Sequence, residues 1–555
     1  MDVKASYDFR PVRGADYWIA GLLFCLAYLL TLAVNHSEGE DSLGLVMSII
    51  RFADGKISHL FNPNHLFFLP VNLIFYSLIT SIGMSVTPVV TMQILNVIAA
   101  VSALLLIIAI TRMMGIPRFW SILASVFVGS SYGFWQYSVE AETYILPLPM
   151  FLLAVMQFYK CMVSEYKIKY AVGVGVFASL AVLLHQQYVF LAITLWLALL
   201  VQHRNDRQIV PTLFWSALAM VVVIGAPYLI VASKIHDIHT FMDAVNWSRG
   251  LASSGLWIEP GFSSLPKAAA GLGRTVYGMD FLFAFDSIYN TLTHLFPTKS
   301  LVEERFLAEG VLPAVRWACL LLLCLSMVSL FSLAALVRWR SMDISPLQRS
   351  MIYLFMAIVI VVAVTTTLWE PQNIEFWIPV LPFSAMSVAL ILSCLRVNRG
   401  YALLVSCIMV SSLFLSNLLG SVYPKTQYDL DFWYQAQRPA INNLERGDLI
   451  WTEGGYIGNR YLLFYSPKAI LVTADDTAQF ETYLRDPNFK GNIYVSSWVK
   501  APMETILKSG RKAKPRHRTD LEQARRIEDL ADSISGHLEL VEENQWQAVY
   551  RYQKE

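Results

Sequence analysis

Apolar stretches alternate with short polar loops along the chain as far as about residue 420. An apolar run of roughly 20 residues is long enough to cross a bilayer as a helix. The pattern therefore predicts about eleven membrane-spanning helices. Their expected bounds are Tyr17–Val34, Pro88–Thr111, Phe119–Tyr137, Tyr144–Lys160, Tyr170–Leu184, Tyr188–Val201, Thr212–Ala232, Val311–Val337, Met351–Leu368, Trp377–Leu395 and Tyr401–Leu419.

The stretch Leu66–Gly83 is apolar enough to be a further span, and its placement decides the side of every later loop. A crossing would place Arg112 and Arg118 outside. An interfacial or re-entrant segment instead makes all later basic loops cytoplasmic, as the positive-inside bias favours, and Pro63 and Pro70 are typical of a broken segment. We therefore expect an interfacial segment. The cytoplasmic loops are then Arg112–Arg118, Lys160–Lys169, His203–Arg207, Arg338–Arg349 and Arg396–Arg399.

The first span follows Lys4, Arg10 and Arg13, so we expect a cytoplasmic N-terminus. No small-residue cleavage site follows the span, which is interpreted as an anchor and not as a removed signal peptide. The outer face is then expected to collect Asn35–Gly83, Tyr137–Thr143, His185–Gln187, Ser233–Gly310, Trp369–Phe376 and the tail after Val422.

Ionisable residues gather at span edges on this outer face. They are Glu38, Glu40, Asp41, Glu140, Glu142, His185, Glu370 and Glu375. Channels and ion pumps usually hold such residues at mid-depth, where their burial is costly and functional. The one-sided pattern instead favours an enzyme that works at the extracytoplasmic surface on a substrate held by the bilayer.

The tail after Val422 reads as a small extracytoplasmic α/β domain. Its expected strands are Asp448–Thr452, Ala469–Thr473, Asn492–Ser496, His537–Val541 and Trp546–Tyr552, with helical stretches near Gln479–Arg485 and Leu521–Ile534. The predicted fold class is a polytopic α-helical membrane protein with this domain at its C-terminus. Residues 1–421 form the membrane domain, with outer loops at 35–87 and 233–310, and residues 422–555 form the α/β domain.

Composition agrees with a membrane protein. The chain is 56% hydrophobic and 15% charged, with a mean hydropathy of +0.49, which excludes an ordinary soluble domain. The net charge of +1 says nothing about partners, and no nucleic-acid partner is expected. All six cysteines lie in or beside apolar spans, and none is placed for a disulfide in a soluble domain. The basic run Lys508–Arg518 is interpreted as a solvated loop, with lipid head-group contact as the alternative.

Four short stretches carry a family resemblance. They are Glu38-Gly39-Glu40-Asp41, Asn62-Pro63-Asn64-His65-Leu66, the aromatic run Ser131–Tyr144 with its Glu140-Ala141-Glu142, and Leu184-His185-Gln186-Gln187. In this order and on one side of the membrane, they resemble the polytopic GT-C glycosyltransferases that use lipid-linked sugars, in a bacterial branch related to the protein O-mannosyltransferases. The likeness covers roughly the first 240 residues. Many members have His-Pro-Pro where this chain has Asn-Pro-Asn-His.

The resemblance implies an inverting sugar transfer from a polyprenyl-phosphate-linked donor to a hydroxyl of a protein, lipid or glycan acceptor. Such a reaction needs a carboxylate that takes the proton of the hydroxyl, and it needs positive charge or donors for the departing phosphate. Asp41 or Glu40 is the expected base. The alternative is that these acids only cap the helix that begins near Ser42.

The remaining candidates are expected to bind substrate. The aromatic faces and amides of the turn Trp369–Trp377 suit a sugar, although tryptophan and tyrosine also mark any membrane interface. For Glu140, Glu142 and His185 the alternative is simple interfacial exposure. The full substrate-binding set is His65, Glu140, Glu142, His185, Gln186, Gln187, Trp369, Glu370, Asn373 and Glu375, with Arg249 and Arg274 for the phosphate.

No ligand spacing requires a cofactor, but outer-face acids such as Asp41 and Glu142 could bind Mg²⁺ or Mn²⁺. Two other functions stay open: a polyprenyl-lipid flippase or transporter, and an envelope-assembly scaffold without catalysis. A transporter is expected to show mid-membrane charges or a repeat between its halves, and neither pattern is evident in the sequence. The expected location is the bacterial inner membrane.

Overall fold

The structure is a computed structural model. It describes residues 15–39, 41–52, 55, 57–164, 166–202, 209–250, 261, 264–295, 301–336, 344–394, 399–499 and 521–553. The chain divides into two compact units. The first comprises residues 1–33, 48–279 and 313–423, and the second comprises residues 34–47, 280–312 and 424–555. The second unit thus draws on three segments of chain, two of which lie within the predicted 1–421 domain.

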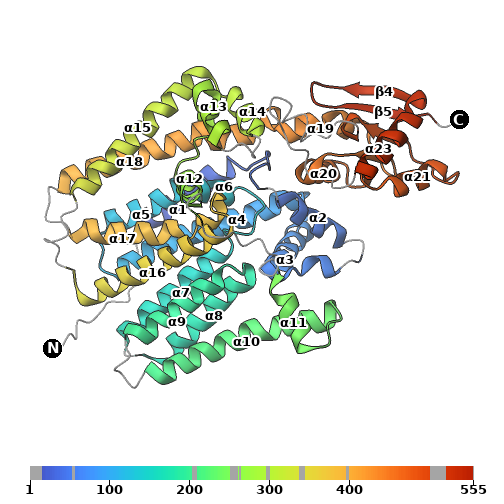
Figure 1. Ribbon diagram of the computed structural model, residues 1–555. Coiled ribbons are helices and arrows are strands. Elements are labelled where there is room, and N and C mark those ends of the chain that lie inside the picture. The colour runs from blue at the N-terminus through green and yellow to red at the C-terminus, as the bar shows by residue number, and fades with distance from the viewer. Residues whose placement is uncertain are drawn as a thin grey trace. The chain divides into compact units, whose positions relative to one another are not determined.

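The first unit is helical (Figure 1). Its helices are α1 (Ala15–Leu29), α3 (Phe68–Ser81), α4 (Pro88–Met113), α5 (Arg118–Ser130), α6 (Tyr132–Ser138), α7 (Pro147–Val163), α8 (Ile168–Leu184), α9 (Tyr188–Gln202), α10 (Ile209–Ile235), α11 (Phe241–Ser248), α12 (Ser264–Val276), α15 (Pro313–Leu336), α16 (Pro346–Trp369), α17 (Val380–Cys394) and α18 (Arg399–Asn417). Helix α2 (Ser42–Phe52) crosses the boundary between the units.

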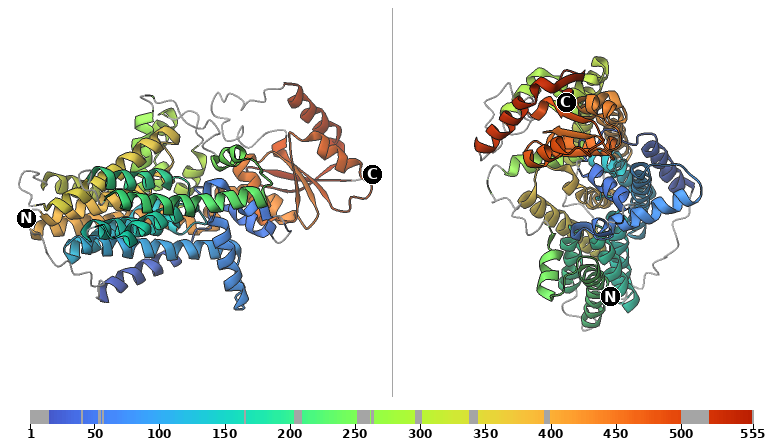
Figure 2. Two further views of the ribbon diagram at one scale, coloured as in Figure 1. Left: turned by 90° about the horizontal axis from the view of Figure 1, so that it is seen from below. Right: turned by 90° about the vertical axis from the view of Figure 1, so that its right-hand side faces the viewer.

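The long helices pack lengthwise. Helix α8 packs against both α7 and α10, and α15 packs against α18. In the left view of Figure 2 most of the long helices of this unit run roughly along one direction. Helix α16 begins at a capping box, in which the Gln348 amide donates to the Ser345 hydroxyl at 3.3 Å and the Ser345 amide donates back to the Gln348 side chain at 3.2 Å.

Six segments of the described chain are long and apolar enough to cross a membrane. They are Pro88–Met113, Ile209–Ile235, Pro313–Ala335, Pro346–Trp369, Ile374–Cys394 and Gly400–Thr426. The other five expected spans fall on α1, α5, α7, α8 and α9, which are 13 to 17 residues long. The protein is therefore an integral membrane protein, and the number of eleven crossings stays a prediction.

One expected span is interrupted. The sequence predicts a continuous helix over Phe119–Tyr137, but α5 ends at Ser130 and α6 begins at Tyr132. Ser131 between them has extended backbone (φ −69°, ψ 135°), and its hydroxyl donates to the Phe127 carbonyl at 2.8 Å. Serine competes for backbone hydrogen bonds in this way and favours helix ends. The break separates α5 from α6, which ends two residues before Glu140.

The second unit contains a five-stranded sheet in the order β2-β1-β3-β5-β4. The strands are β1 (Leu449–Thr452), β2 (Ile470–Thr473), β3 (Ile493–Ser496), β4 (Leu538–Glu543) and β5 (Ala548–Tyr552). The first three are parallel, β3 and β5 are antiparallel, and β4 and β5 form an antiparallel pair. All five lie within a few residues of the predicted strands, which confirms an α/β domain.

Helices cover both faces of this sheet. The helices of the unit are α13 (Asp286–Leu295), α14 (Val302–Gly310), α19 (Phe432–Asn443), α20 (Gly455–Tyr465), α21 (Thr477–Arg485) and α23 (Leu521–Ser533), of which α19 to α23 supply the cover. Successive residues of β1 point to opposite faces. Ile450 packs with Ala440 of α19 and Leu462 of α20, whereas Trp451 stacks on Phe480 of α21 with ring centroids 4.3 Å apart. The sequence did not predict α19 and α20.

Candidate active site

The segment that follows α6 carries two buried carboxylates. Glu140 is fully buried and Glu142 is 2% exposed, which rules out the alternative of simple surface exposure. Asn96 of α4 holds the segment, because its amide donates to the carbonyls of both glutamates at 2.7 Å. The Glu140 carboxylate accepts the Ala141 amide at 3.1 Å, and that of Glu142 accepts the Thr143 amide at 3.2 Å. Burying a carboxylate costs free energy unless it is hydrogen-bonded, and backbone amides of this loop donate to both carboxylates.

Glu375 is held by two tyrosines. Tyr137 donates to its Oε2 at 2.6 Å, and Tyr144 donates to its Oε1 at 3.0 Å. The Tyr144 ring also lies 4.7 Å from the His185 ring and 5.6 Å from the Phe376 ring, centroid to centroid. Three segments that are distant in sequence thus converge in the first unit, and two of the predicted residues, His185 and Glu375, share Tyr144 as a neighbour.

The turn between α8 and α9 joins the other loops. The backbone amide of Gln186 donates to the Asn64 carbonyl at 2.7 Å, and its side chain donates to the Ser248 carbonyl at 2.6 Å. These two bonds connect Gln186 to the 3₁₀ turn Pro63–His65 and to the end of α11, which are distant from it in sequence. The Gln187 side chain donates to the Phe376 carbonyl at 3.1 Å. The two glutamines therefore serve the framework of the site, with their side-chain amides committed to backbone carbonyls.

His185 is buried beside this framework. Burial lowers the pKa of its imidazole to about 3, and the charge of His65 acts in the same direction. Its Nδ1 accepts the Gln187 amide at 3.2 Å, so the proton of the neutral ring lies on Nε2. His185 is thus a neutral hydrogen-bond donor at physiological pH. His65 ends the 3₁₀ turn Pro63–His65, and its ring lies 6.1 Å from the Phe68 ring.

The two predicted phosphate ligands lie on different elements. Arg249 is exposed and directly follows α11. The next residue, Gly250, closely approaches Asn64: a Cβ on this glycine would lie 2.2 Å from the Asn64 Oδ1. The backbone of Arg249 is therefore placed beside the 62–65 segment. Arg274 is half-buried on α12, which packs against α6 and the 3₁₀ turn Ile374–Trp377.

The polar turn after α16 is folded on itself. The Asn373 side chain donates to the Glu370 carboxylate, and the Trp377 indole donates to the Pro371 carbonyl at 3.0 Å. Trp369 is the last residue of α16. Glu370 and Asn373 therefore pair with one another, whereas Glu375 points to the two tyrosines.

The expected base lies in the second unit. Asp41 precedes α2 and is 60% exposed, and its Oδ1 accepts hydrogen bonds from Tyr456 at 2.9 Å and from Arg460 at 2.7 Å. Within the described residues, its side chain bonds to α20 and not to the first turn of α2, so helix capping does not account for it. Glu40 lies outside the described residues.

Glu38 has a different environment from Asp41. Its carboxylate lies 3.2 Å from the Lys425 ammonium, which is 2% exposed and also lies 3.7 Å from Asp280. The Lys425 carbonyl accepts the amides of Val34 and Asn35 at 3.0 and 3.1 Å. This buried ionic group fastens the loop after α1 within the second unit, and it makes Glu38 a structural residue.

Part of this arrangement was not predicted. Tyr137 and Tyr144 stand in the aromatic run that the sequence singles out, and their spacing around the two glutamates is the signal that could have identified them. Nothing in the sequence links Arg460 or Tyr456 to Asp41. Among the described residues there is no group of three or more His, Cys, Asp or Glu side chains arranged for a metal, so Mg²⁺ or Mn²⁺ at Asp41 and Glu142 stays a prediction.

No protein-family model and no curated protein matches the chain, but solved structures are similar to it. ArnT from Cupriavidus metallidurans bound to undecaprenyl phosphate has a TM-score of 0.55 at 10% identity, over 97% of this chain and 98% of that chain. ArnT from the same organism in the apo state has a TM-score of 0.48 at 12% identity, over the same shares. The protein O-mannosyltransferase complex Pmt1-Pmt2 of S. cerevisiae, bound to the sugar donor, has a TM-score of 0.29 at 14% identity, over 46% of this chain and 37% of that chain.

Only the first of these scores is high enough to indicate a common fold. It covers nearly the whole of both chains, so the present chain shares the GT-C fold of ArnT over nearly its whole length. This confirms the fold that the sequence resemblance implies, and it extends that resemblance beyond the first 240 residues.

Proposed function

We propose that this protein is an inverting glycosyltransferase of the extracytoplasmic face of a bacterial inner membrane. It moves a sugar from a polyprenyl-phosphate-linked donor to a hydroxyl of a protein, lipid or glycan. The observation that carries the proposal is the convergence of Tyr137, Tyr144, His185 and Glu375 in a chain with a GT-C fold. The undecaprenyl phosphate bound to ArnT supports a lipid-linked donor.

In the proposed reaction Asp41 is the general base, with Glu40 as the alternative. Its carboxylate takes the proton of the acceptor hydroxyl while that oxygen attacks the anomeric carbon. The bond from the anomeric carbon to the phosphate oxygen breaks, and polyprenyl phosphate leaves with the bonding electron pair. Attack opposite the leaving group inverts the configuration at the anomeric carbon. The 60% exposure of Asp41 leaves its carboxylate accessible to an acceptor.

Other predicted residues supply the proposed substrate-binding groups. His185 is neutral and offers Nε2–H to a sugar hydroxyl, and the rings of Tyr144 and Phe376 offer apolar faces to sugar C–H groups. Glu140 and Glu142 lie in the loop between the two tyrosines that hold Glu375. Arg249 is the proposed phosphate ligand, because it is exposed and its backbone adjoins the 62–65 segment. Arg274 is the second candidate.

Donor turnover by the purified protein tests the proposal and separates it from transport and scaffolding. The protein is reconstituted in liposomes with a panel of radiolabelled undecaprenyl-phosphate hexoses and pentoses, with host envelope material as the acceptor. We expect one donor to be consumed and its label to appear in the envelope fraction. Movement of an intact donor across the bilayer would instead indicate a flippase. If the protein neither consumes nor moves any donor, the scaffold function is favoured.

A further inference from the structure

Helix α20 of the C-terminal domain binds the carboxylate of Asp41 through two side chains. Tyr456 and Arg460 are four residues apart and therefore lie on one face of the helix. The Tyr456 hydroxyl donates to Oδ1 of Asp41 at 2.9 Å, and Nη1 of Arg460 donates to the same oxygen at 2.7 Å. The Arg460 guanidinium also lies 3.8 Å from the centroid of the Tyr456 ring, so each donor supports the other.

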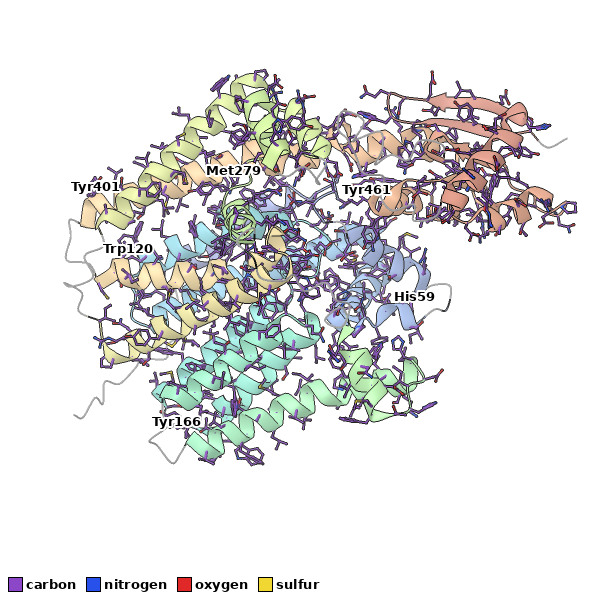
Figure 3. All side chains as sticks on the ribbon, viewed as in Figure 1. His59, Trp120, Tyr166, Met279, Tyr401 and Tyr461 are labelled. Carbon is purple, nitrogen blue, oxygen red and sulfur yellow. The ribbon has the colours of Figure 1, made fainter. Side chains whose placement is uncertain are left out.

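The same helix contacts the loop around Asp41 at two further points. Tyr461, labelled in Figure 3, is fully buried, and its hydroxyl accepts the His36 amide at 2.8 Å. On the other side of Asp41, a Cβ on Gly44 would lie 3.0 Å from Cζ of Arg460. Helix α20 thus contacts the loop both before and after the candidate base. These contacts restrict the position of the Arg460 guanidinium relative to Asp41.

The position of α20 is itself fixed within the domain. Gly455, at the start of the helix, has a φ of +66°, a backbone conformation that residues other than glycine rarely adopt. A Cβ on Gly458 would lie 2.9 Å from the Trp433 ring, and the Gln437 side chain donates to the Gly458 carbonyl at 2.9 Å. This close packing against α19 fixes α20 within the domain, and with it the positions of Tyr456 and Arg460.

The Asp41–Arg460 pair is poorly suited to stabilise the fold. Asp41 is 60% exposed and Arg460 is 27% exposed, and ion pairs this accessible to water contribute little to stability. Both donors bind Oδ1, and within the described residues Oδ2 accepts no hydrogen bond. Two donors on one oxygen fix the rotation of the carboxylate and leave the other oxygen to accept a proton.

We propose that Arg460 and Tyr456 are positioning residues for Asp41, so that the C-terminal domain takes part in the transfer reaction. This inference rests on the proposed function, in which Asp41 is the base. Precise orientation of a reacting group accounts for a large share of enzymatic rate, and a displacement of about 1 Å can cost roughly 100-fold. Loss of either donor should therefore slow the transfer step and leave donor binding intact.

The test measures single-turnover transfer and donor binding in the full-length protein, with the radiolabelled donor identified by the panel above. Arg460→Met is expected to slow transfer by roughly 10- to 100-fold, with the donor dissociation constant unchanged. Tyr456→Phe should slow it less, because the guanidinium remains, and Arg460→Lys should recover part of the loss. Arg485→Met is the matched control, because Arg485 forms an exposed ion pair with Glu481 at 2.8 Å in the same domain. It should match the parent.

A double variant distinguishes positioning from a structural role. In an Asp41→Asn protein there is no base to position, so adding Arg460→Met should cause no further loss of rate. An equal loss in both backgrounds, or a parent-like rate in Arg460→Met alone, would overturn the inference and leave the proposed function standing. A parent-like rate in Asp41→Asn would overturn both the base assignment and the inference.

Discussion

The Tyr137 hydroxyl donates to Oε2 of Glu375 over 2.6 Å, although the two residues are 238 positions apart in the chain. Tyr144 donates to the other oxygen of the same carboxylate at 3.0 Å. A carboxylate that accepts one hydroxyl on each oxygen is fixed in orientation, and such charge-assisted bonds are stronger than neutral ones. Glu375 therefore has a fixed orientation beside the Tyr144 ring, which packs against His185.

Glu375→Gln is expected to slow sugar transfer by roughly 10- to 100-fold, since a hydrogen bond to a charged group is worth about 1.5–3 kcal/mol. The amide places a donor where a carboxylate oxygen accepted, so one tyrosine hydroxyl loses its acceptor. Tyr159→Phe is the control, because Tyr159 donates to the Met113 carbonyl elsewhere in the first unit. Single-turnover transfer measures the effect. If Glu375→Gln and Tyr159→Phe have equal rates, Glu375 has no role in the site.

Local pattern predicted many of the elements, with α19 and α20 among the exceptions, but it did not predict the contacts between them. The five strands of the C-terminal domain were predicted because alternating apolar residues and turn residues mark them directly. His185 and Glu375 were predicted because charges at span edges stand out. Their link through Tyr144 was not, because a tyrosine beside a membrane is common and its partner lies 231 residues away.

The acidic cluster around Asp41 shows the same limit. The sequence places Glu38 and Asp41 in one acidic cluster, in which Asp41 or Glu40 is the expected base. In the structure Glu38 pairs with the buried Lys425, 387 residues away, and Asp41 pairs with Arg460, 419 residues away. The different roles of Glu38 and Asp41 become visible only from how the C-terminal domain packs around them.

Asp431→Asn is expected to change the pH dependence of stability. Asp431 is fully buried at the N-cap of α19, and burial raises its pKa from 3.8 to about 7, with hydrogen bonds and the charge of His36 opposing the shift. Its stabilising contribution is therefore complete below pH 3.8 and is lost as the pH rises through 7. Asparagine keeps the cap and cannot ionise. Compared with the parent, the variant should gain stability between about pH 5 and pH 8.

Thermal unfolding of both proteins at these two pH values measures the difference. Asp476→Asn is the control, since Asp476 caps α21 in the same domain at an exposed position, accepting the Gln479 amide at 3.0 Å. If Asp431→Asn and Asp476→Asn respond to pH in the same way, the buried cap carries no special pH dependence.

Cysteine labelling from outside tests the predicted sidedness. Helix α3 has 14 residues, about 21 Å at 1.5 Å per residue, which is short of a roughly 30 Å hydrocarbon core. In a cysteine-free background, cysteines at the exposed positions of Met84 and Thr482 should be labelled, and one at Arg118 should be protected. Labelling at 118 with protection at 84 would mean that α3 crosses and that the sidedness is inverted beyond it.

The most direct test of the account is the rate of a single turnover from the polyprenyl-phosphate sugar in Asp41→Asn and Glu40→Gln, measured beside donor binding. Loss of general-base help typically costs about 10²- to 10⁴-fold in rate. We predict a loss of this size in Asp41→Asn, with donor binding retained. If both variants stay within about threefold of the parent while Glu140→Gln or Glu142→Gln abolishes transfer, the base lies in the second outer loop. If all four carboxylates are dispensable in folded protein, the chain is not a glycosyltransferase of the proposed kind.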